Sequence, residues 1–348
     1  MTGFARLRTQ YDIVVLGGGH AGLQAGLKAA LLHHSALVVD RGPRYSRSYY
    51  APRMDNIPGF PQGISGHKLL DLQREALRPY ASRVTYLGPA VAQEVVPRPG
   101  GGFQVRLEWL RQNQTVAASV VILAMGVVDR MPHVHGKIDH IFPWANFGIV
   151  DYCLICDGHT LPGRSVAVLG ETRFAVLTAL DILHFEPRSV TLLTHGAPLL
   201  PDVPPEERMA LEAELAAAKI PVMTGEIDAF QGLREKRFGV RFSDGTQVEF
   251  DKGFSALGWY RMNSEIPRAL GARFDADGFV VTDEDCRVLS AEGEPVIPGL
   301  YAVGDLRNGW NQVPEAWATA ERAVIHAWAE YLPELREKPR ENPPTPVP

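Results

Sequence analysis

Tyr11-Asp-Ile-Val-Val-Leu-Gly17-Gly-Gly19-His-Ala-Gly22 is the stretch of sequence that decides the fold. A β-branched run favours a strand before Gly17, and an alanine- and leucine-rich run favours a helix after Gly22, to about His33. The spacing Gly17-x-Gly19-x-x-Gly22 permits a tight turn, close approach of a pyrophosphate to the backbone and close helix packing. The next apolar strand, residues 36–40, ends in Asp40, where a carboxylate can bind ribose hydroxyls. These residues predict a βαβ unit that binds a dinucleotide.

The same pattern occurs a second time in the chain. Ser165-Val-Ala-Val-Leu-Gly170 is again a β-branched run that ends in glycine, followed by a helical stretch to about His184 and an apolar strand over residues 190–193. A β-rich segment follows each unit, at residues 103–123 and at residues 240–250, where Asp244-Gly245 is a hairpin signal. The repeat predicts an α/β fold of two Rossmann-like dinucleotide-binding domains, each with a β-meander.

Length and composition limit the class of protein. The chain has 348 residues, of which 45% are hydrophobic, so we expect roughly two globular domains. Its formal charge of −5 argues against a nucleic-acid or anionic-membrane partner. The longest nearly apolar run, residues 116–128, is shorter than the ~20 residues that span a bilayer. No signal peptide is evident, and we expect a cytoplasmic protein.

Two of the three cysteines form a Cys153-x-x-Cys156 pair, and three cysteines are too few for a disulfide scaffold. Such a pair is a redox centre, part of a metal site, or a pair of small packing residues. Zinc needs four ligands, and the chain has no second Cys-x-x-Cys. Asp157 and Gly158, directly after the pair, favour the redox interpretation, and we expect no metal. Cys286 is expected to be a packing residue.

Five motifs in this order resemble the low-molecular-weight thioredoxin reductases, a family of FAD-dependent disulfide oxidoreductases. They are the first glycine motif, Asn56-Ile-Pro-Gly-Phe-Pro-Gln-Gly-Ile-Ser-Gly66, Ala124-Met-Gly126-x-x-x-Arg130-x-Pro132, Cys153-Leu-Ile-Cys156-Asp157-Gly158 and Gly299-Leu-Tyr-Ala-Val-Gly304-Asp305. The resemblance implies a discontinuous FAD-binding domain, residues 1–128 and 259–331. Residues 129–258 would then be an inserted NAD(P)-binding-like domain that carries the cysteine pair. Residues 332–348 are expected to be a loosely packed, proline-rich tail.

The resemblance also implies roles for single residues. Those expected to bind FAD are Gly17, Gly19, Gly22, Asp40, Asn56, Gly126, Gly304, Asp305 and Gln312. In the catalytic group, Cys156 would face the flavin, Cys153 would attack the partner disulfide, and Asp157 would shuttle the proton. The partner is expected to be a thioredoxin-like protein or a small disulfide or dithiol, and the protein a homodimer.

The second glycine turn departs from the first. Gly17, Gly18, Gly19 and Gly22 correspond to Gly170, Glu171, Thr172 and Ala175. The β-branched Thr172 hinders approach of a pyrophosphate to the backbone, and Glu171 adds a carboxylate beside it unless its side chain points to solvent. Arg173 is either a phosphate ligand or an exposed residue of the helix start.

The end of the second strand departs as well. Thr194-His195-Gly196 stands where the family usually has a His-Arg-Arg cluster for the 2′-phosphate of NADPH. No acid there matches Asp40, which would suit NADH. Binding of NADPH is therefore doubtful. The segment Arg44–Arg53 replaces a Gly-Gly-Gln element of the family, and it is either a flavin contact or a solvated loop.

Three functions are compatible with these residues. The favoured one is a thioredoxin-reductase-like flavoprotein that exchanges two electrons between FAD and a disulfide through Cys153 and Cys156, without efficient use of NADPH. An ordinary NADPH-dependent thioredoxin reductase is the second. The third is a flavin-binding regulatory protein without turnover, which would not need Cys153, Cys156 and Asp157.

Overall fold

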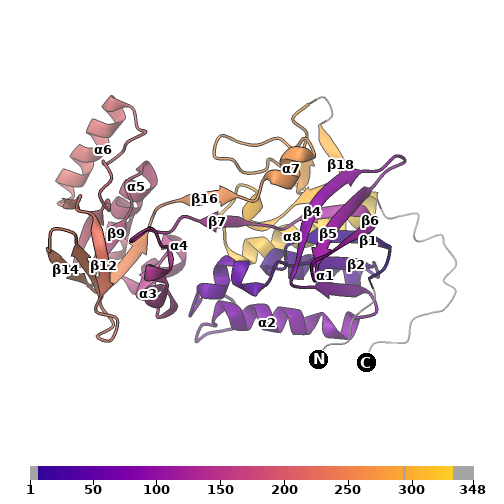
Figure 1. Cartoon of the computed structure of the whole chain (residues 1–348), viewed down its shortest axis with the longest axis horizontal. Coiled ribbons are helices and arrows are strands. Elements are labelled where there is room, and N and C mark those ends of the chain that lie inside the picture. Colours follow the sequence, from indigo (N-terminus) through magenta and orange to yellow (C-terminus); the bar gives the residue numbers. More distant parts are fainter. Residues whose placement is uncertain (1–6, 293–294, 332–348) are drawn as a thin grey trace. The chain divides into compact units, whose positions relative to one another are not determined.

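The computed structural model describes residues 7–292 and 295–331, which form two compact units (Figure 1). Unit 1 contains the described residues up to Tyr49, His67–Val128 and those from Arg261 onward; unit 2 contains Tyr50–Gly66 and Asp129–Tyr260. Residues 50–66 thus group with unit 2. The resemblance implied that they belong to the FAD-binding domain. The proline-rich tail expected at residues 332–348 lies outside the described residues.

Unit 1 is built on a mixed eight-stranded sheet with the order β17-β18-β6-β1-β2-β3, and β5 and β4 continue from β6. The strands β18, β6, β1, β2 and β3 run parallel, whereas β4, β5 and β6 form an antiparallel meander. The strands are β1 (Gln10–Leu16), β2 (Ala36–Val39), β3 (Val84–Leu87), β4 (Ala90–Pro97), β5 (Phe103–Trp109), β6 (Gln112–Leu123), β17 (Arg287–Leu289) and β18 (Val296–Ala302). The helices are α1 (His20–Leu31), α2 (Gly66–Ala76), α7 (Glu265–Ala269) and α8 (Val313–Glu330).

Alternation along β1 explains how unit 1 buries both faces of its sheet. Ile13 and Val15 belong to a core shared with α1 and α8, and Val14 and Leu16 belong to a second core shared with the β4-β5-β6 meander. A strand buried on both faces reads as a continuous apolar run, as observed before Gly17.

Unit 2 repeats this organisation on a smaller scale. Its five-stranded sheet is parallel, with the order β11-β10-β9-β15-β8, and a separate antiparallel meander has the order β12-β13-β14. The strands are β8 (Val150–Asp151), β9 (Ser165–Leu169), β10 (Ser189–Leu193), β11 (Val222–Met223), β12 (Ile227–Gln231), β13 (Phe238–Phe242), β14 (Gln247–Phe250) and β15 (Lys252–Ser255). The helices are α3 (Phe142–Asn146), α4 (Leu154–Asp157), α5 (Arg173–Asp181) and α6 (Pro205–Ala217). Val166 and Val168 pack toward α5, and Ala167 and Leu169 toward the meander.

The two Rossmann-like α/β domains predicted from the repeat are confirmed. The chain passes between the units along β7 (Val127–Asp129) and β16 (Trp259–Met262), which pair with each other. Residues 280–289 contain only the short strand β17 and isolated bridges. Asp283 accepts backbone N–H groups of Asp285 and Arg287, and this turn leaves isolated bridges and the short β17. Among the described helices, none is long and apolar enough to cross a bilayer.

Candidate active site

The first glycine turn has no room for side chains at two of its glycines. Gly17 has φ +113°, and a Cβ there would lie 2.2 Å from the backbone oxygen of Ala124. A Cβ on Gly22 would lie 1.7 Å from the oxygen of Gly17. Gly19 precedes α1, whose N-terminus has neither a side-chain cap nor an acidic residue in its first turn. This bare turn and its free helix amides fit the pyrophosphate of a dinucleotide.

Asp40 lies buried at the end of β2 with both carboxylate oxygens engaged. Oδ1 accepts the Gly42 N–H at 3.0 Å, and Oδ2 accepts the Tyr86 hydroxyl. Burial, and then the charge of Asp40, raise the pKa of Tyr86, so that Tyr86 remains a donor. The carboxylate is thus held beside the glycine turn, where a Cβ on Gly18 would lie 2.5 Å from its Cβ.

Three further expected cofactor residues gather near this turn in unit 1. A Cβ on Gly304 would lie 3.0 Å from Ala21 in α1, and a Cβ on Gly126 would lie 4.0 Å from Asp305. Asp305 Oδ2 pairs with Arg47 Nη1 at 3.0 Å. Arg47 therefore gives the segment Arg44–Arg53 one defined contact at the expected site. Asn263, which belongs to none of the sequence motifs, donates its side-chain amide to the backbone oxygen of Gly126 at 3.0 Å.

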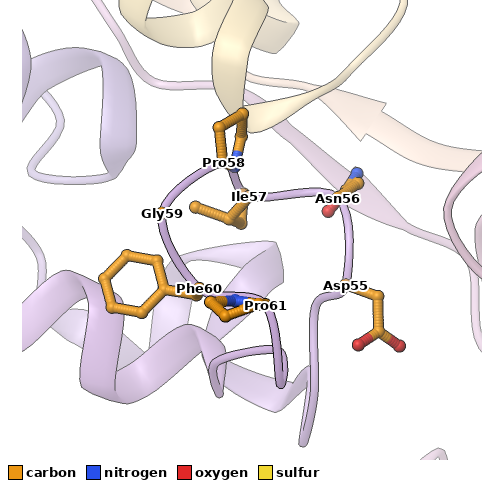
Figure 2. Close-up of a pocket in the computed structure, with 7 residues that line it drawn as sticks. All are labelled: Asp55, Asn56, Ile57, Pro58, Gly59, Phe60 and Pro61. Atoms are coloured by element: carbon orange, nitrogen blue, oxygen red, sulfur yellow. The ribbon is translucent and has the colours of Figure 1, made fainter.

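Gln312 and Asn56 are the other two expected flavin contacts. Gln312 lies in unit 1 at the start of α8, and its side-chain amide donates to the backbone oxygen of Trp310 at 3.3 Å. Asn56 lies in unit 2, in a loop around an open pocket of about 370 Å³ (Figure 2). The structure thus groups eight of the nine expected cofactor residues in unit 1 and places Asn56 in unit 2.

Cys153 and Cys156 form a disulfide at the start of α4, with Cα atoms 5.2 Å apart. The backbone oxygen of Cys153 accepts the N–H groups of Cys156 at 3.1 Å and Asp157 at 3.0 Å. This single helical turn brings the two sulfurs together. Between them, Ile155 is 61% exposed, so an apolar side chain is available next to the disulfide.

Asp157 is a carboxyl with an unusually high proton affinity. Burial is the main cause, repulsion by Asp151 and Asp55 adds to it, and Lys252 opposes it, so that its pKa is raised to about 7. A group with a pKa near neutrality suits general acid–base chemistry. The structure therefore brings the three expected catalytic residues into one turn, and the role expected for Asp157 is chemically reasonable.

The neighbours of Asp157 come from several segments of the chain, and none of them was among the expected site residues. Lys252 is buried, pairs with Asp151 and donates to the backbone oxygen of Gly148 at 2.6 Å. Asp55 Oδ2 lies 3.1 Å from His159 Nε2. A lysine in a β-strand and an acid two residues before Cys153 are signals that could have indicated the first pair.

The second glycine turn is filled by side chains of the protein itself. Glu171 is 7% exposed, and its Oε1 pairs with Arg130 Nη1 at 2.9 Å. Its side chain therefore does not point to solvent. The Thr172 hydroxyl accepts the Ala175 N–H at 3.4 Å and caps α5. Glu171 and Thr172, which correspond to Gly18 and Gly19 of the first turn, thus carry side chains that are engaged within the protein.

The described residues directly after β10, Thr194 to Gly196, include no lysine or arginine near this turn. Thr194 is buried and donates to the backbone oxygen of Ala197 at 2.7 Å. His195 Nδ1 accepts the Ile227 N–H at 2.8 Å, and Nε2 lies 2.9 Å from the His133 oxygen. Arg173 is exposed and pairs with Glu207 at 2.6 Å.

The described residues contain no group of three or more His, Cys, Asp or Glu side chains placed to hold a metal ion. His135 and His140 have the His-x₄-His spacing of zinc ligands, but they belong to no such group among the described residues. Cys286 is free and 1% exposed, as expected of a packing residue.

Comparison with known families identifies the chain. The sequence profile of the pyridine nucleotide-disulphide oxidoreductases matches residues 11–322. The chain belongs to that family. It is therefore an oxidoreductase of the flavoprotein type, and the resemblance to thioredoxin reductases is confirmed at the level of family and fold.

Relatives and solved structures of this family cover most of the chain. It is 29% identical to a thioredoxin reductase of Mycolicibacterium smegmatis over 86% of this chain and 89% of that one. It is 24% identical to a thioredoxin reductase of Treponema pallidum, over 95% and 100%. The crystal structure of thioredoxin reductase from Streptococcus pyogenes superposes with a TM-score of 0.76 at 22% identity, covering 94% of this family member and 100% of that chain.

Proposed function

We propose that this family member is an FAD-dependent thiol–disulfide oxidoreductase that exchanges two electrons with a thioredoxin-like protein or a small dithiol, and that it uses NADPH poorly. The observation that carries the proposal is the disulfide of Cys153 and Cys156 directly before Asp157, whose pKa is raised to about 7. By resemblance to the thioredoxin reductases, we propose a cytoplasmic homodimer as the working form.

The chemistry at the disulfide follows from these three residues. A thiolate of the partner attacks Sγ of Cys153, the bond between Cys153 and Cys156 breaks, and Cys156 leaves with the electron pair of that bond. Asp157 is protonated near neutral pH and gives its proton to the leaving sulfur. The second partner thiol then attacks the partner sulfur bound to Cys153, Cys153 leaves with the electron pair, and the proton of that thiol passes to Cys153. The partner becomes a disulfide, while this chain holds a dithiol and an ionised Asp157. The reverse sequence reduces a partner disulfide.

The cofactor expected for this reaction fits the residues of unit 1. Gly17, Gly19 and Gly22 would hold the pyrophosphate of FAD, and Asp40 would hold its ribose hydroxyls. FAD, when bound, supplies the two-electron exchange with the cysteine pair. The steric limits at Gly17 and Gly22 and the oriented carboxylate of Asp40 support this assignment.

Poor use of NADPH is supported by the second glycine turn. A dinucleotide pyrophosphate bound there would compete with Glu171 for Arg130 and would meet the Thr172 side chain. Like charges in contact repel by about 1 to 4 kcal/mol, depending on the effective dielectric constant. Thr194 and His195 are engaged with the backbone and supply no charge for a 2′-phosphate.

Anaerobic stopped-flow mixing with dithiothreitol tests the dithiol reaction. We expect the flavin absorbance of the oxidised protein to bleach as electrons pass from the dithiol through the disulfide. A Cys156→Ser variant should lose this response, and Cys286→Ser should keep it, because Cys286 lies outside the site. Reduced thioredoxin then tests the protein partner in the same way.

The outcome separates the proposed enzyme from a flavin-binding protein without turnover. If only dithionite bleaches the flavin, the dithiol reaction is absent and the proposal fails. If Cys156→Ser bleaches as fast as the unchanged protein, the cysteine pair is not the route of the electrons.

A further inference from the structure

His20 is a buried histidine within the first glycine turn of unit 1. It is the first residue of α1, directly after Gly19, and only 7% of it is exposed. Its Nδ1 contacts Oε1 of Gln73 in α2, and its ring packs edge-on against Trp317 in α8, with the ring centroids 6.5 Å apart. Helices α2 and α8 thus hold the imidazole at the start of α1.

The second ring nitrogen of His20 is left without a partner. The side-chain amide of Gln73 donates to the backbone oxygen of His20 at 3.4 Å, and its oxygen accepts from Nδ1, so the neutral ring carries its proton on Nδ1. Nε2 is then a bare lone pair, and it is buried with no hydrogen-bond partner among the described residues. A buried polar atom left unpaired is unfavourable, and it calls for an explanation such as a bound water, ion or ligand.

A second buried histidine of unit 1 shows that an unpaired nitrogen alone does not make a site. His34 is 6% exposed, and its Nε2 also lacks a hydrogen-bond partner among the described residues. It follows the C-terminal end of α1, and its Nδ1 lies 3.6 Å from Asp12. The C-terminal end of a helix disfavours an anion, whereas the N-terminal end attracts one. Of the two histidines, His20 is the one that stands where an anion is favoured.

The groups around His20 keep its ring neutral until an anion arrives. Gln73 and Trp317, the contacts from α2 and α8, carry no charge. Asp305 acts on the ring from the short helix η7 (Gly304–Leu306), but Arg47 is paired with Asp305. Burial lowers the pKa of His20, and the hydrogen bond of Gln73 and the charge of Asp305 oppose it only in part. A doubly charged pyrophosphate beside the ring would reverse that balance.

We propose that His20 is a further FAD-binding residue, whose Nε2 takes up a proton when FAD binds and donates it in a hydrogen bond to the pyrophosphate at the start of α1. The proton comes from solvent and returns there when FAD leaves, and no covalent bond other than N–H changes. In the bound state both ring nitrogens are donors, Nδ1 to Gln73 and Nε2 to the cofactor. This inference rests on FAD as the cofactor, which belongs to the proposed function.

Binding of FAD to the apoprotein, followed by quenching of the flavin fluorescence, tests the inference without any turnover. The affinity of the unchanged protein should fall as the pH rises from 6 to 8, by up to about tenfold per pH unit, because the bound state holds one more proton. Calorimetry in two buffers of different ionisation enthalpy should show uptake of protons on binding. In ¹⁵N NMR at pH 7, the imidazole of His20 should change from neutral to protonated when FAD is added.

Two substitutions separate the proton from the shape of the ring. His20→Gln keeps a polar side chain that does not titrate, and His20→Phe keeps a ring without nitrogen. Both should bind FAD about tenfold more weakly at pH 6 and lose most of the dependence on pH. His34→Gln is the matched control, since it removes a buried histidine of the same unit at the other end of α1, and it should keep both. Circular dichroism shows whether each variant is folded, and the pH dependence of the unchanged protein decides if His20→Phe is not.

The outcomes distinguish this inference from the proposed function. An affinity that does not change with pH in the unchanged protein, or an equal pH dependence in His20→Gln, would overturn the role of His20 and leave FAD as the cofactor. An apoprotein that binds no FAD at any pH would refute the cofactor itself, and with it both the proposed function and this inference.

Discussion

The two glycine turns share one backbone arrangement and differ in their side chains. The N–H of Gly17 donates to the Val39 oxygen at 2.8 Å, and that of Gly170 donates to the Leu193 oxygen at 3.0 Å. A Cβ on Gly17 would meet the oxygen of Ala124, and one on Gly170 would meet that of Ala256. The strand, turn and helix are thus equivalent in both units, and equivalent backbone is not enough to make equivalent sites.

The residue at the end of the second strand explains how the turns could diverge. In unit 1, Asp40 lies against Gly18, and a side chain at Gly18 would collide with it. In unit 2, the small Thr194 takes the place of Asp40, and Glu171 fits in the place of Gly18, where it pairs with Arg130. A side chain at the position of Gly18 and an acid at the position of Asp40 therefore exclude each other sterically.

The largest expected effect is that of Gly22→Ala. The added Cβ would lie 1.7 Å from the Gly17 oxygen, so the helix and the turn must separate. We expect loss of most of the bound flavin and a decrease of about 1–3 kcal/mol in the free energy of unfolding. Flavin-to-protein absorbance and thermal unfolding measure both. The control is Ala175→Gly in the second turn, which should cost at most about 1 kcal/mol and leave the flavin content unchanged.

Asp157→Asn tests whether unit 2 keeps its redox chemistry despite its altered turn. The pKa of Asp157 is about 7 in the folded protein, above the ordinary value of 3.8, so folding favours its protonated form. Its ionisation in the unfolded chain therefore lowers stability as the pH rises from about 4 to 7. At pH 8, Asp157→Asn should therefore be more stable than the unchanged protein, with a free energy of unfolding higher by about 1–3 kcal/mol and a higher unfolding temperature. This difference in stability should decrease toward pH 4.

The same variant should react more slowly with dithiothreitol by a factor of about 10² or more. Calorimetry at pH 4, 6 and 8 and stopped-flow mixing measure the two effects. A variant that is both less stable at pH 8 and equally fast would show that Asp157 is an ordinary surface acid.

Asp40→Asn tests the acid that distinguishes the first turn from the second. It keeps an acceptor for the Tyr86 hydroxyl but removes the charge, and we expect about tenfold weaker FAD binding to the apoprotein, measured by fluorescence quenching. Tyr86→Phe should weaken binding less, because it leaves the carboxylate in place. Equal FAD affinity in the unchanged protein, Asp40→Asn and Tyr86→Phe would show that Asp40 does not contribute to FAD binding.

Glu171→Gly combined with Thr172→Gly should have the smallest effect, a gain of about tenfold or less in affinity for NADPH. The change clears the turn and frees Arg130, but Thr194 and His195 still provide no cation for the 2′-phosphate. Calorimetric titration measures it, with Glu207→Gln as the control at an exposed ion pair of α5. An unchanged affinity for NADPH would show that residues other than Glu171 and Thr172 prevent its binding.

The sequence predicted the repeated strand-turn-helix pattern because its causes are local. Gly17, Gly22 and Gly170 are required by contacts within the turn and its adjoining strands, and β-branched runs mark strands buried on both faces. The cysteine pair and Asp157 were found for the same reason, since one helical turn joins them.

Contacts between side chains far apart in the chain could not be predicted from the sequence. Glu171 could point to solvent or inward, and its partner Arg130 is forty-one residues away in the chain. The pKa of Asp157 depends on Asp151, Lys252 and Asp55, which only the fold brings near. The grouping of residues 50–66 with unit 2 likewise depends on contacts such as that of Asp55 with His159.

Anaerobic mixing of the oxidised holoprotein with NADPH tests the difference between the two turns most directly. The flavin absorbance is followed against a parallel reaction with dithiothreitol at the same concentration. We expect reduction by NADPH to be at least about tenfold slower than reduction by the dithiol. Rapid, stoichiometric bleaching by NADPH would contradict the account, because it would show that the second turn, with Glu171 and Thr172 in place, still delivers a pyridine nucleotide to the flavin.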